Sequence, residues 1–543
     1  MLDLRTRSRL GLQAGVGLAA LLLAPLLGPG YVLVRDMVFV PRLPLGGQLL
    51  GLDGVPRAVP SDLLVALAGR VVAAGWLQDA VLLAVVACGA WGAARLAPTS
   101  SSAGALTAAM AYGWSAYLHE RLLLGQWALL VGWAVLPWAA DAALAWRRGH
   151  PGWPAVACLA VAATGGASAL LLAGLVVVVC GRPVKALAAT AVLSLPWVVP
   201  GLLQEVAAGD PKGVSAFAAA ADTPLGVLGS LLTGGGVWAS AAVPSGRSAG
   251  VLAAVLVLLV AVAGLPVLWA RAGGRLVVAG LLGLLLAALG HLPGLSDALR
   301  WAVVHVPAAG LLRDGQKWLA PFVLLVAAAA ACGTERVLSR IPTQPVRRVA
   351  GVLAVVAPLA ALPGAAWAEH GRLAVSYYPA DWERVTASTR GAVLVLPWTL
   401  YRAFPWDADR TVLDPATKLV RRPVVNDALP LAHGSVRGED PLAARVDAAV
   451  RSGAPLLPAL RAAGIGQVLV ERTTRGADRD ALERQTRGLT VVTETKELAL
   501  YAVPGGGTGP SRRPVWPVGL GDLLAAGYGL AAVVLAVRGR RPY

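Results

Sequence analysis

Long apolar stretches alternate with short polar loops along almost the whole of this chain, and twelve such stretches can be counted. A helix of about 20 apolar residues is long enough to cross the hydrocarbon core of a bilayer. The mean hydropathy is +0.66 and only 14% of the residues are charged, which excludes an ordinary soluble enzyme. We therefore predict a polytopic α-helical membrane protein of about twelve spans, at residues 10–34, 77–96, 103–118, 126–146, 152–166, 167–181, 184–203, 249–270, 276–292, 316–333, 348–368 and 516–537.

The positive charge of the chain is concentrated in short loops beside these stretches. Cytoplasmic loops of membrane proteins carry an excess of Lys and Arg, so these loops predict the orientation. They place both termini in the cytoplasm of a plasma-membrane protein whose first span is not cleaved. The net charge of +17 is explained in this way, and no nucleic-acid partner is expected. The loops concerned contain Arg95 and residues 146–150, 181–185, 271–275, 334–347 and 538–541.

The outer face then carries three long loops, at 35–76, 204–248 and 293–315, and one longer segment at 369–515. Short apolar runs alternate with helical patterns in the longer segment, which predicts a small α/β domain. The chain is thus divided into a membrane core (1–368), an extracytoplasmic domain and a last helix with a basic tail (516–543). The expected strands are 391–398, 467–472, 489–495 and 498–503, and the expected helices are 441–463 and 477–486.

Ionisable residues are almost absent from the middle of the predicted spans. Asp79, Asp141 and His291 all lie towards span ends. Ion-coupled transporters usually carry such groups near the middle of the bilayer, so this pattern counts against that class. Any chemistry is expected at the outer membrane surface.

The first candidate group follows the first span directly. Asp36 lies about two residues beyond the span, between Arg35 and Arg42. A partly desolvated carboxylate at the mouth of a membrane cavity is suited to act as a general base. The alternative is an ion pair at a span end. Asp53 and Asp62 are weaker candidates, and Asp62 is better explained as a favourable charge in the first turn of an interfacial helix.

The second candidate group is the turn YLHERLLLGQW at 117–127, where His119, Glu120 and Arg121 follow one another. Three ionisable residues at a lipid boundary are costly unless they pair or bind a polar ligand. His119 and Glu120 could hold a divalent cation or help a base, and Arg121 could bind phosphate. The alternative is a turn with an internal Glu–Arg pair.

The third group is GLLRDGQKWLAPF at 310–322, in which Arg313 and Lys317 are four residues apart. If a helix has begun there, both side chains share one face and bind an anion together, such as the phosphate of a lipid carrier. Interfacial anchoring by Arg, Lys and Trp is the alternative.

Aromatic residues in WTLYRAFPW, at 398–406, form a fourth group in the predicted outer domain. Trp398, Tyr401 and Trp406 are candidates for stacking on sugar rings, and packing within the domain is the alternative.

The order of these motifs resembles the GT-C superfamily of glycosyltransferases, which use polyprenyl-phosphate sugars. The resemblance rests on the acidic first outer loop, ERLLLGQW (120–127), SLLTGGGVW (230–238), LLRDGQKW (311–318) and the outer α/β domain. It is greatest to the arabinofuranosyltransferase and mannosyltransferase types of actinobacterial cell-envelope assembly. It covers most of the chain as a layout, although each motif is short.

The resemblance implies a sugar transfer at the outer membrane surface, from a polyprenyl-phosphate donor to an envelope glycan or glycolipid. It implies that Asp36 is the base and Glu120 a second acidic residue, and that Arg313 or Lys317 lies near the donor phosphate. The first loop has one Asp where many GT-C enzymes have an acidic pair, which leaves a metal requirement open. A lipid or glycan transporter and a non-catalytic envelope scaffold are the alternative functions.

Overall fold

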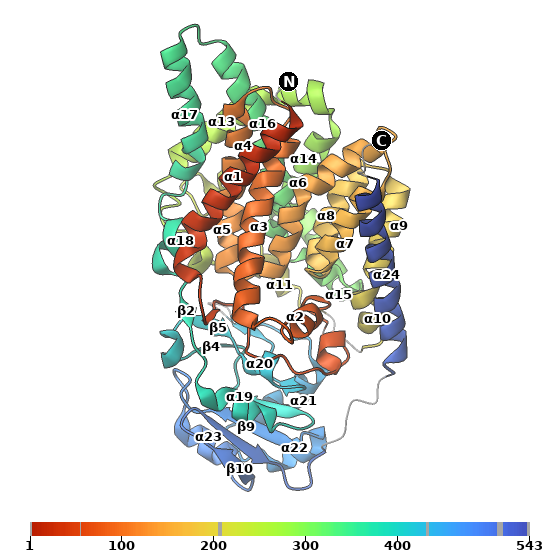
Figure 1. The fold of residues 1–543 in the computed structure, drawn as a ribbon. Helices are drawn as coiled ribbons and strands as arrows, with labels where there is room; N and C mark the ends of the chain where they lie inside the picture. The colour runs from red at the N-terminus through yellow and green to blue at the C-terminus, as the bar shows by residue number, and fades with distance from the viewer. Residues whose placement is uncertain (1–2, 55, 205–208, 431–433, 508–513, 540–543) are drawn as a thin grey trace.

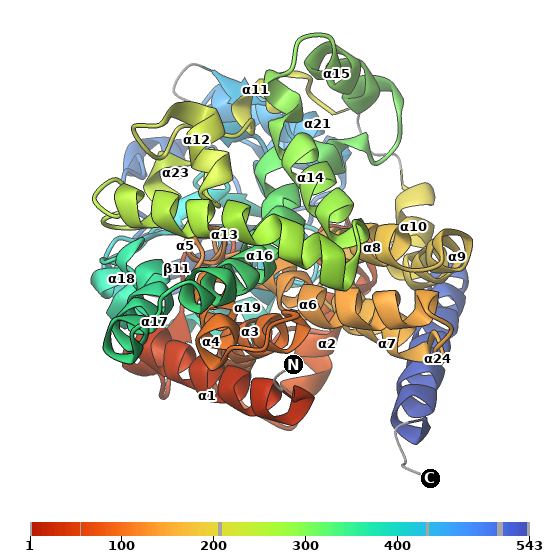
Figure 2. The same cartoon turned by 90° about the horizontal axis from the view of Figure 1, so that it is seen from above.

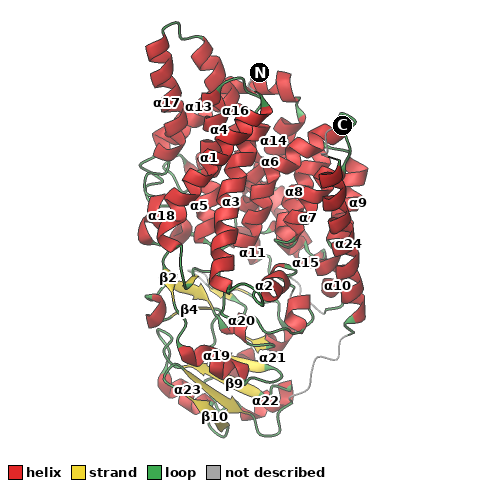
Figure 3. Cartoon of the chain, viewed as in Figure 1, coloured by secondary structure: helices red, strands yellow, loops and turns green. Residues whose placement is uncertain are grey.

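The computed structural model describes residues 3–54, 56–204, 209–430, 434–507 and 514–539. A helical bundle forms one part of the molecule, and a smaller domain with most of the strands lies at one end of it (Figure 1, Figure 3). The start of α1 and the end of α24 both lie at the end of the bundle away from that domain (Figure 1). The first residues of α1 and the last residues of α24 therefore lie on the same side of the bundle.

Six helical segments in the described residues are long and apolar enough to cross a membrane. Two bent pairs raise the number to eight if each pair is one span: α9 with α10, bent by 61°, and α14 with α15, bent by 84°. The bounds of the long helices are α1 Leu4–Leu23, α3 Ala74–Leu96, α6 Trp127–Arg147, α13 Val251–Ala272, α16 Ala320–Ser339 and α24 Trp516–Arg538.

The prediction of twelve spans is therefore wrong, although the membrane-protein class is supported. The predicted span at 103–118 is two helices, α4 and α5, separated at Trp114 and Ser115. The predicted spans at 152–166 and 167–181 are the separate helices α7 and α8, divided near Gly165 and Gly166 as predicted, but they have only 11 and 14 residues. A hydropathy window averages over a break such as that between α4 and α5, so it cannot distinguish a broken helix from a continuous one.

The shorter helices complete the bundle and its outer loops. In the view from above, α24 lies at one edge of the bundle beside α7, α9 and α10 (Figure 2). The remaining bounds are α2 Ser61–Ala68, α4 Ser102–Gly113, α5 Ala116–Leu123, α7 Trp153–Ala163, α8 Ala167–Cys180, α9 Pro183–Leu193, α10 Leu195–Leu202, α11 Lys212–Ala216, α12 Gly226–Leu232, α14 Arg275–Ala288, α15 Leu295–His305, α17 Gln344–Ala360 and α18 Ala366–Gly371.

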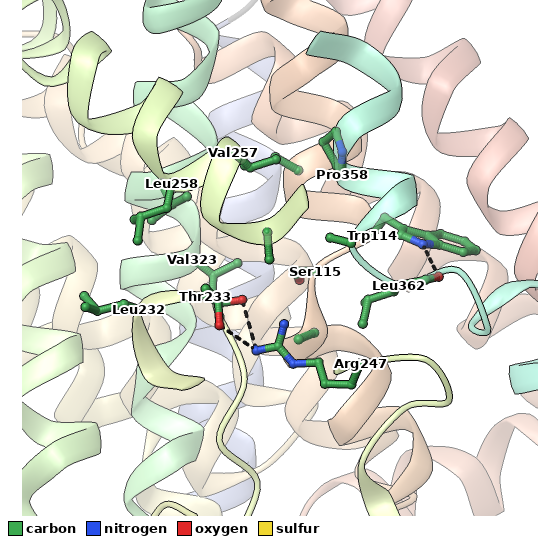
Figure 4. Close-up of a pocket in the computed structure, with 16 residues that line it drawn as sticks. Trp114, Ser115, Leu232, Thr233, Arg247, Val257, Leu258, Val323, Pro358 and Leu362 are labelled. Carbon is green, nitrogen blue, oxygen red and sulfur yellow. Dashed lines mark hydrogen bonds between the residues drawn. The ribbon is translucent and has the colours of Figure 1, made fainter. Parts of the chain in front are cut away.

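Helices α13 and α16 are packed very closely because glycine lies on both contact surfaces. A Cβ added to Gly264 would overlap the carbonyl of Ala329, and one added to Gly333 would overlap the carbonyl of Val260. Small residues allow helix backbones to approach in an apolar medium, where dispersion contacts rather than hydrophobic burial hold helices together. Residues of both helices also line a cavity in the bundle, as does Arg247 (Figure 4).

The smaller domain, which we name the outer domain after its predicted position, contains a five-stranded sheet in the order β10-β11-β9-β3-β6. Strand β3 is parallel to β9 and to β6, whereas β9, β11 and β10 are antiparallel neighbours. Every residue of β3 is buried, so this strand has packed faces on both sides. The bounds are β3 Val393–Leu396, β6 Pro423–Val424, β9 Gln467–Glu471, β10 Thr490–Glu494 and β11 Leu498–Ala502, with helices α19 Ala380–Ala387, α20 Ala416–Leu419, α21 Pro441–Arg451, α22 Leu457–Ala463 and α23 Arg479–Gln485.

The four predicted strands are present at the expected places, and the predicted helix at 477–486 is α23. The predicted helix at 441–463 is instead two helices, α21 and α22, with a break at residues 452–456. The segment is also more closely attached to the bundle than a tethered domain would be. Strand β1 (Tyr31–Val32), just after α1, pairs with β2 (Val375–Ser376), and Arg35 pairs with Val412 of β5 (Thr411–Leu413). Strand β5 in turn pairs with β4 (Tyr401–Ala403). The first outer loop is therefore part of the outer domain's hydrogen-bonded structure.

Candidate functional site

Asp36 lies at the junction between the bundle and the outer domain. The N–H of Arg35 donates to the carbonyl of Thr411 at 2.8 Å, and the N–H of Asp36 donates to the carbonyl of Leu124 at 3.1 Å. Arg35 has a positive φ of 41°, which turns the chain sharply at this point. The Asp36 backbone is therefore held from both sides, by β5 of the outer domain and by the end of α5.

The Asp36 carboxylate is only partly exposed and receives two side-chain hydrogen bonds. The hydroxyl of Tyr401 donates to its Oδ1 at 2.6 Å, and Nε2 of Gln126 donates to its Oδ2 at 3.4 Å. Burial raises the pKa of Asp36 above its ordinary value, although both hydrogen bonds and the nearby Arg57 oppose the rise. A carboxylate with a raised pKa is a stronger base than an ordinary aspartate.

Gly125 fixes the turn that brings Gln126 to Asp36. Its φ is +79°, and a Cβ at this position would overlap the backbone of Val34 and Met37. Glycine is needed here both for the left-handed conformation and for the close approach of the first outer loop. The motif ERLLLGQW therefore requires glycine at this position, because the backbone around Asp36 packs directly against it.

Arg121 is the centre of a buried polar network behind Asp36. Its side chain is fully buried. It donates to Oε1 of Gln126 at 2.7 Å, to both carboxylate oxygens of Asp314, and to Oε1 of Gln316. Burial raises the pKa of Asp314, but the Arg121 guanidinium outweighs this and holds it below the ordinary value. Asp314 therefore stays ionised beside the arginine.

The network continues from Gln316 to a second carboxylate pair. Nε2 of Gln316 donates to Oε2 of Glu120 at 2.8 Å. Burial, and then the neighbouring Asp222 carboxylate, raise the pKa of Glu120 well above its ordinary value. Asp222 accepts from Nε of Arg247 at 3.2 Å and from the N–H of Gly236 at 2.8 Å, and contacts of this kind lower its pKa despite its burial. The pKa values of the two neighbouring carboxyl groups are therefore shifted in opposite directions.

His119 does not join this network. Its Nδ1 is hydrogen bonded to Oε1 of Glu369, and both side chains are completely buried. Glu369 belongs to a left-handed turn in which residues 367–370 all have a φ between 53° and 57°. His119 and Glu120 are consecutive on α5 and point in different directions, so His119 contacts Glu369 and Glu120 contacts Gln316. No group of three or more His, Cys, Asp or Glu side chains that could hold a metal ion occurs in the described residues.

Arg313 and Lys317 do not share a helix face, so that expectation is wrong. The short helices η5 (Ala309–Leu312) and η6 (Gly315–Leu319) are separated at Asp314, whose ψ of 86° is not helical. Arg313 donates to Oε1 of Glu439 at 2.9 Å, and Nζ of Lys317 donates to Oγ of Ser168 at 3.2 Å. The two cations flank Asp314 in the chain but have different polar partners.

The aromatic candidates of the outer domain also separate. Trp406 stacks on Phe404, with 5.0 Å between ring centroids, and Nε1 of Trp398 donates to Oδ1 of Asp447 at 2.8 Å. Both rings are thus used in packing, as the alternative interpretation proposed. Tyr401 is the member that contacts the site, through Asp36.

The two weaker first-loop candidates bind cations of the outer domain. Asp62 pairs with Lys418, and Asp53 lies 4.0 Å from Arg422. These contacts help to dock the domain on the bundle. They leave Asp36 as the first-loop carboxylate that meets the network around Arg121.

Sequence reasoning missed four polar members of the network. Gln126 and Gln316 lie within the motifs ERLLLGQW and LLRDGQKW, so the motifs themselves were the available signal. Asp222 and Arg247 lie 25 residues apart in one outer loop and have no recognisable pattern. Only the folding of that loop onto α5 brings them to Glu120.

Comparisons of the chain with protein-family models, with curated proteins and with solved structures find no match.

Proposed function

We propose that this protein is a membrane-embedded glycosyltransferase. It would move a sugar from a polyprenyl-phosphate donor to an envelope glycan or glycolipid, at the junction between the bundle and the outer domain. The observation that carries the proposal is the arrangement around Asp36: a partly exposed carboxylate of raised basicity, backed by a buried, cation-centred network.

Asp36 is suited to the role of general base. In the proposed reaction an acceptor hydroxyl oxygen attacks the anomeric carbon, and the bond from that carbon to the phosphate oxygen breaks. The phosphate leaves with the electron pair, and the hydroxyl proton moves to Asp36. Tyr401 and Gln126 hold the two carboxylate oxygens in a fixed orientation, which such a proton transfer requires.

The cations near this carboxylate favour a negatively charged leaving group. Arg57 has a half-exposed side chain and reaches both Asp427 and Glu439, and Arg313 pairs with the same Glu439. A phosphate that arrives at this surface would compete with these carboxylates for the two guanidinium groups. Arginine binds phosphate through planar, paired hydrogen bonds, which strengthen in a site of low dielectric.

The membrane location fits the substrate class. Six to eight apolar helical spans support residence in a lipid bilayer. A lipid-linked sugar keeps its hydrocarbon chain in the membrane, so its phosphate must be bound at the interface while the sugar extends outward. Asp36, Gln126 and Tyr401 are the polar side chains of the junction. The junction lies where the bundle meets the smaller domain (Figure 1).

The test is sugar transfer by purified protein in liposomes with radiolabelled polyprenyl-phosphate sugars and an envelope glycan acceptor. Asp36→Asn should reduce transfer by about 10²- to 10⁴-fold, the usual contribution of a general base. Asp297→Asn is the matched control, because Asp297 is an exposed carboxylate paired with Arg300, outside the junction. Its transfer rate should equal that of the wild type.

Three outcomes would count against the proposal. Full transfer by Asp36→Asn would show that Asp36 is not the general base. Movement of the labelled lipid between leaflets without a new glycosidic bond would favour a transporter. Neither transfer nor movement with any donor would favour a non-catalytic scaffold, in which the ion pairs of Arg57 and Arg313 only dock the outer domain.

A further inference from the structure

An open groove lies on the surface of the bundle, between the start of α1 and the end of α3. Its volume is about 390 Å³, within the range of about 300–1,000 Å³ that small-molecule sites occupy. Its lining includes Arg5, Ser8, Arg9 and Leu12 of α1 and Trp91 and Arg95 of α3. Nε1 of Trp91 donates to Oγ of Ser8 at 2.8 Å, so a hydrogen bond joins the two helices at the groove.

The groove lies at the end of the bundle away from the outer domain. Figure 1 shows the start of α1 at that end. Nη1 of Arg7 donates to the carbonyl of Ala97, just beyond α3, so the end of α3 lies there too. Arg5 and Arg9 fall in the first two turns of an apolar segment of 23 residues, the depth at which lipid headgroups meet a spanning helix.

Two arginines of the groove have unused charges. Arg5 and Arg9 are exposed and four residues apart, so they share one face of α1. Within the described residues neither has a hydrogen bond or an ion pair. Asp3 interacts with Arg5, but its carboxylate also caps α1 by accepting from the N–H of Thr6 at 2.5 Å.

The third arginine, Arg95, is only partly neutralised. Its Nη2 donates to Oδ2 of Asp141 at 3.3 Å, and Arg7 interacts with the same carboxylate. Its Nε is buried and has no hydrogen-bond partner among the described residues. One carboxylate thus serves two guanidinium groups, and an anion in the groove would reduce the repulsion among the cations.

An apolar surface continues from the groove along α1. Leu12 borders the groove and is 41% exposed, and Val16, one turn further on, is 55% exposed. With spacings of three and four residues, both lie on the same face of α1 as Arg9. A ligand that uses the whole surface therefore has a negative group at one end and a hydrocarbon chain at the other.

We propose that this groove binds one anionic phospholipid, with its phosphate between Arg5, Arg9 and Arg95 and one acyl chain along Leu12 and Val16. Guanidinium groups bind phosphate oxygens through charge-assisted hydrogen bonds. The charge pattern predicts that this end of the bundle is cytoplasmic, and the cytoplasmic leaflet is rich in anionic lipid. The groove and Asp36 lie at opposite ends of the bundle, so the proposal does not depend on sugar transfer.

The experiment is native mass spectrometry of the full chain, released from detergent and titrated with phosphatidylglycerol or with phosphatidylcholine of the same acyl chains. Wild-type protein should retain phosphatidylglycerol preferentially. Arg5→Gln/Arg9→Gln should weaken its binding about 25-fold, from about fivefold for each arginine near an anionic headgroup. Because neither side chain has an internal partner, this variant should keep the wild-type free energy of unfolding.

The matched control is Arg340→Gln/Arg348→Gln, which removes two exposed arginines outside the groove. Arg340 follows α16, and Arg348 lies in the second turn of α17. Glu335, near the end of α16, accepts from the N–H of Ser100 at 2.9 Å, so the control charges lie at the same end of the bundle as the groove. This variant should bind phosphatidylglycerol as the wild type does.

The acyl chain is tested with two further probes. Glycerol 3-phosphate carries the anion without a chain and should bind at least about tenfold more weakly than phosphatidylglycerol, since each buried CH₂ adds favourable transfer free energy. Phosphatidylglycerol with a diazirine on one acyl chain should label the peptide that contains Leu12 and Val16. The label should be lost from this peptide in Arg5→Gln/Arg9→Gln.

Three results would overturn the proposal. Equal retention of phosphatidylcholine would mean that the arginines do not select an anionic headgroup. Equal losses in the groove variant and the control would assign the binding to surface charge in general. Glycerol 3-phosphate that binds as tightly as the lipid would make the groove a site for a soluble anion.

Discussion

The ion pair of Arg121 with Asp314 should be among the most strongly coupled pairs in the protein. The Arg121 side chain is fully buried, while that of Asp314 is 17% exposed. Arg121→Met removes all donors to Asp314, Gln126 and Gln316 at once. Asp314→Asn keeps the shape of the partner but removes its charge.

The magnitudes follow from burial and from the number of contacts. Removal of one member of a buried ion pair costs about 3–5 kcal/mol, because the other charge is left without compensation. Asp314→Asn leaves Arg121 its two glutamine partners and should cost about 1.5–3 kcal/mol, the value for hydrogen bonds to charged groups. In the double variant no isolated charge remains, so its cost should be about 2 kcal/mol less than the sum of the single variants.

The assay is the free energy of unfolding of all four proteins in mixed micelles at neutral pH. Because Arg121 holds the pKa of Asp314 below the ordinary value of 3.8, the carboxylate is ionised at this pH and the coupling is fully present. The coupling should disappear as the pH falls through that lowered pKa. The exposed pair Arg300 and Asp297 provides a control cycle, for which less than about 1 kcal/mol is expected.

An additive result would refute this reasoning. If the double variant costs the sum of the single variants within about 0.5 kcal/mol, Arg121 and Asp314 do not stabilise one another. Gln126 and Gln316 would then have to hold Arg121 without help from the carboxylate.

Three further predictions concern the junction and the outer domain. A general base must be ionised, and burial raises the pKa of Asp36, so sugar transfer should decline on acidification at a pH above the ordinary 3.8. Tyr401→Phe removes a hydrogen bond to the ionised carboxylate. In a pH–rate profile this variant should show the decline about one to two pH units higher than the wild type. Gly125→Ala should lower the unfolding free energy by more than about 1 kcal/mol and reduce transfer, since the residue has a φ of +79° and no space for a Cβ; unchanged values in both assays would contradict this. Arg402→Met should destabilise the outer domain by about 3–5 kcal/mol, seen as faster proteolysis, because Arg402 neutralises two fully buried carboxylates; unaltered protease resistance would count against it.

The residues that follow the first span show how far the sequence could lead. Local pattern was enough to select Asp36, Glu120 and Arg121, because ionisable groups beside long apolar stretches are costly and therefore noticeable. Local pattern also predicted the strands of the outer domain, since alternating short apolar runs have few other folded solutions. Neither pattern indicated that Asp36 contacts Tyr401, because the two residues are 365 residues apart in the chain.

The errors have a common physical cause. The prediction of twelve spans and the shared face of Arg313 and Lys317 both assumed that a helix continues where hydropathy or spacing allows it. In the structure, α4 ends at Gly113 and α5 begins after Ser115, and η5 ends at Leu312 and η6 begins after Asp314. Backbone breaks of this kind are determined by packing against distant segments, so a local window does not detect them.

The sequence by itself determined the apolar helical bundle and the presence of a small sheet region near the C-terminus. These features depend on composition and periodicity along the chain, because each apolar residue contributes its own free energy of burial. The tertiary structure alone decided that the outer domain docks on the first loop, that Arg121 links Asp36 to Glu120, and that Arg247 faces an apolar cavity. Those contacts join side chains from separate loops, and their geometry exists only when the helices have packed.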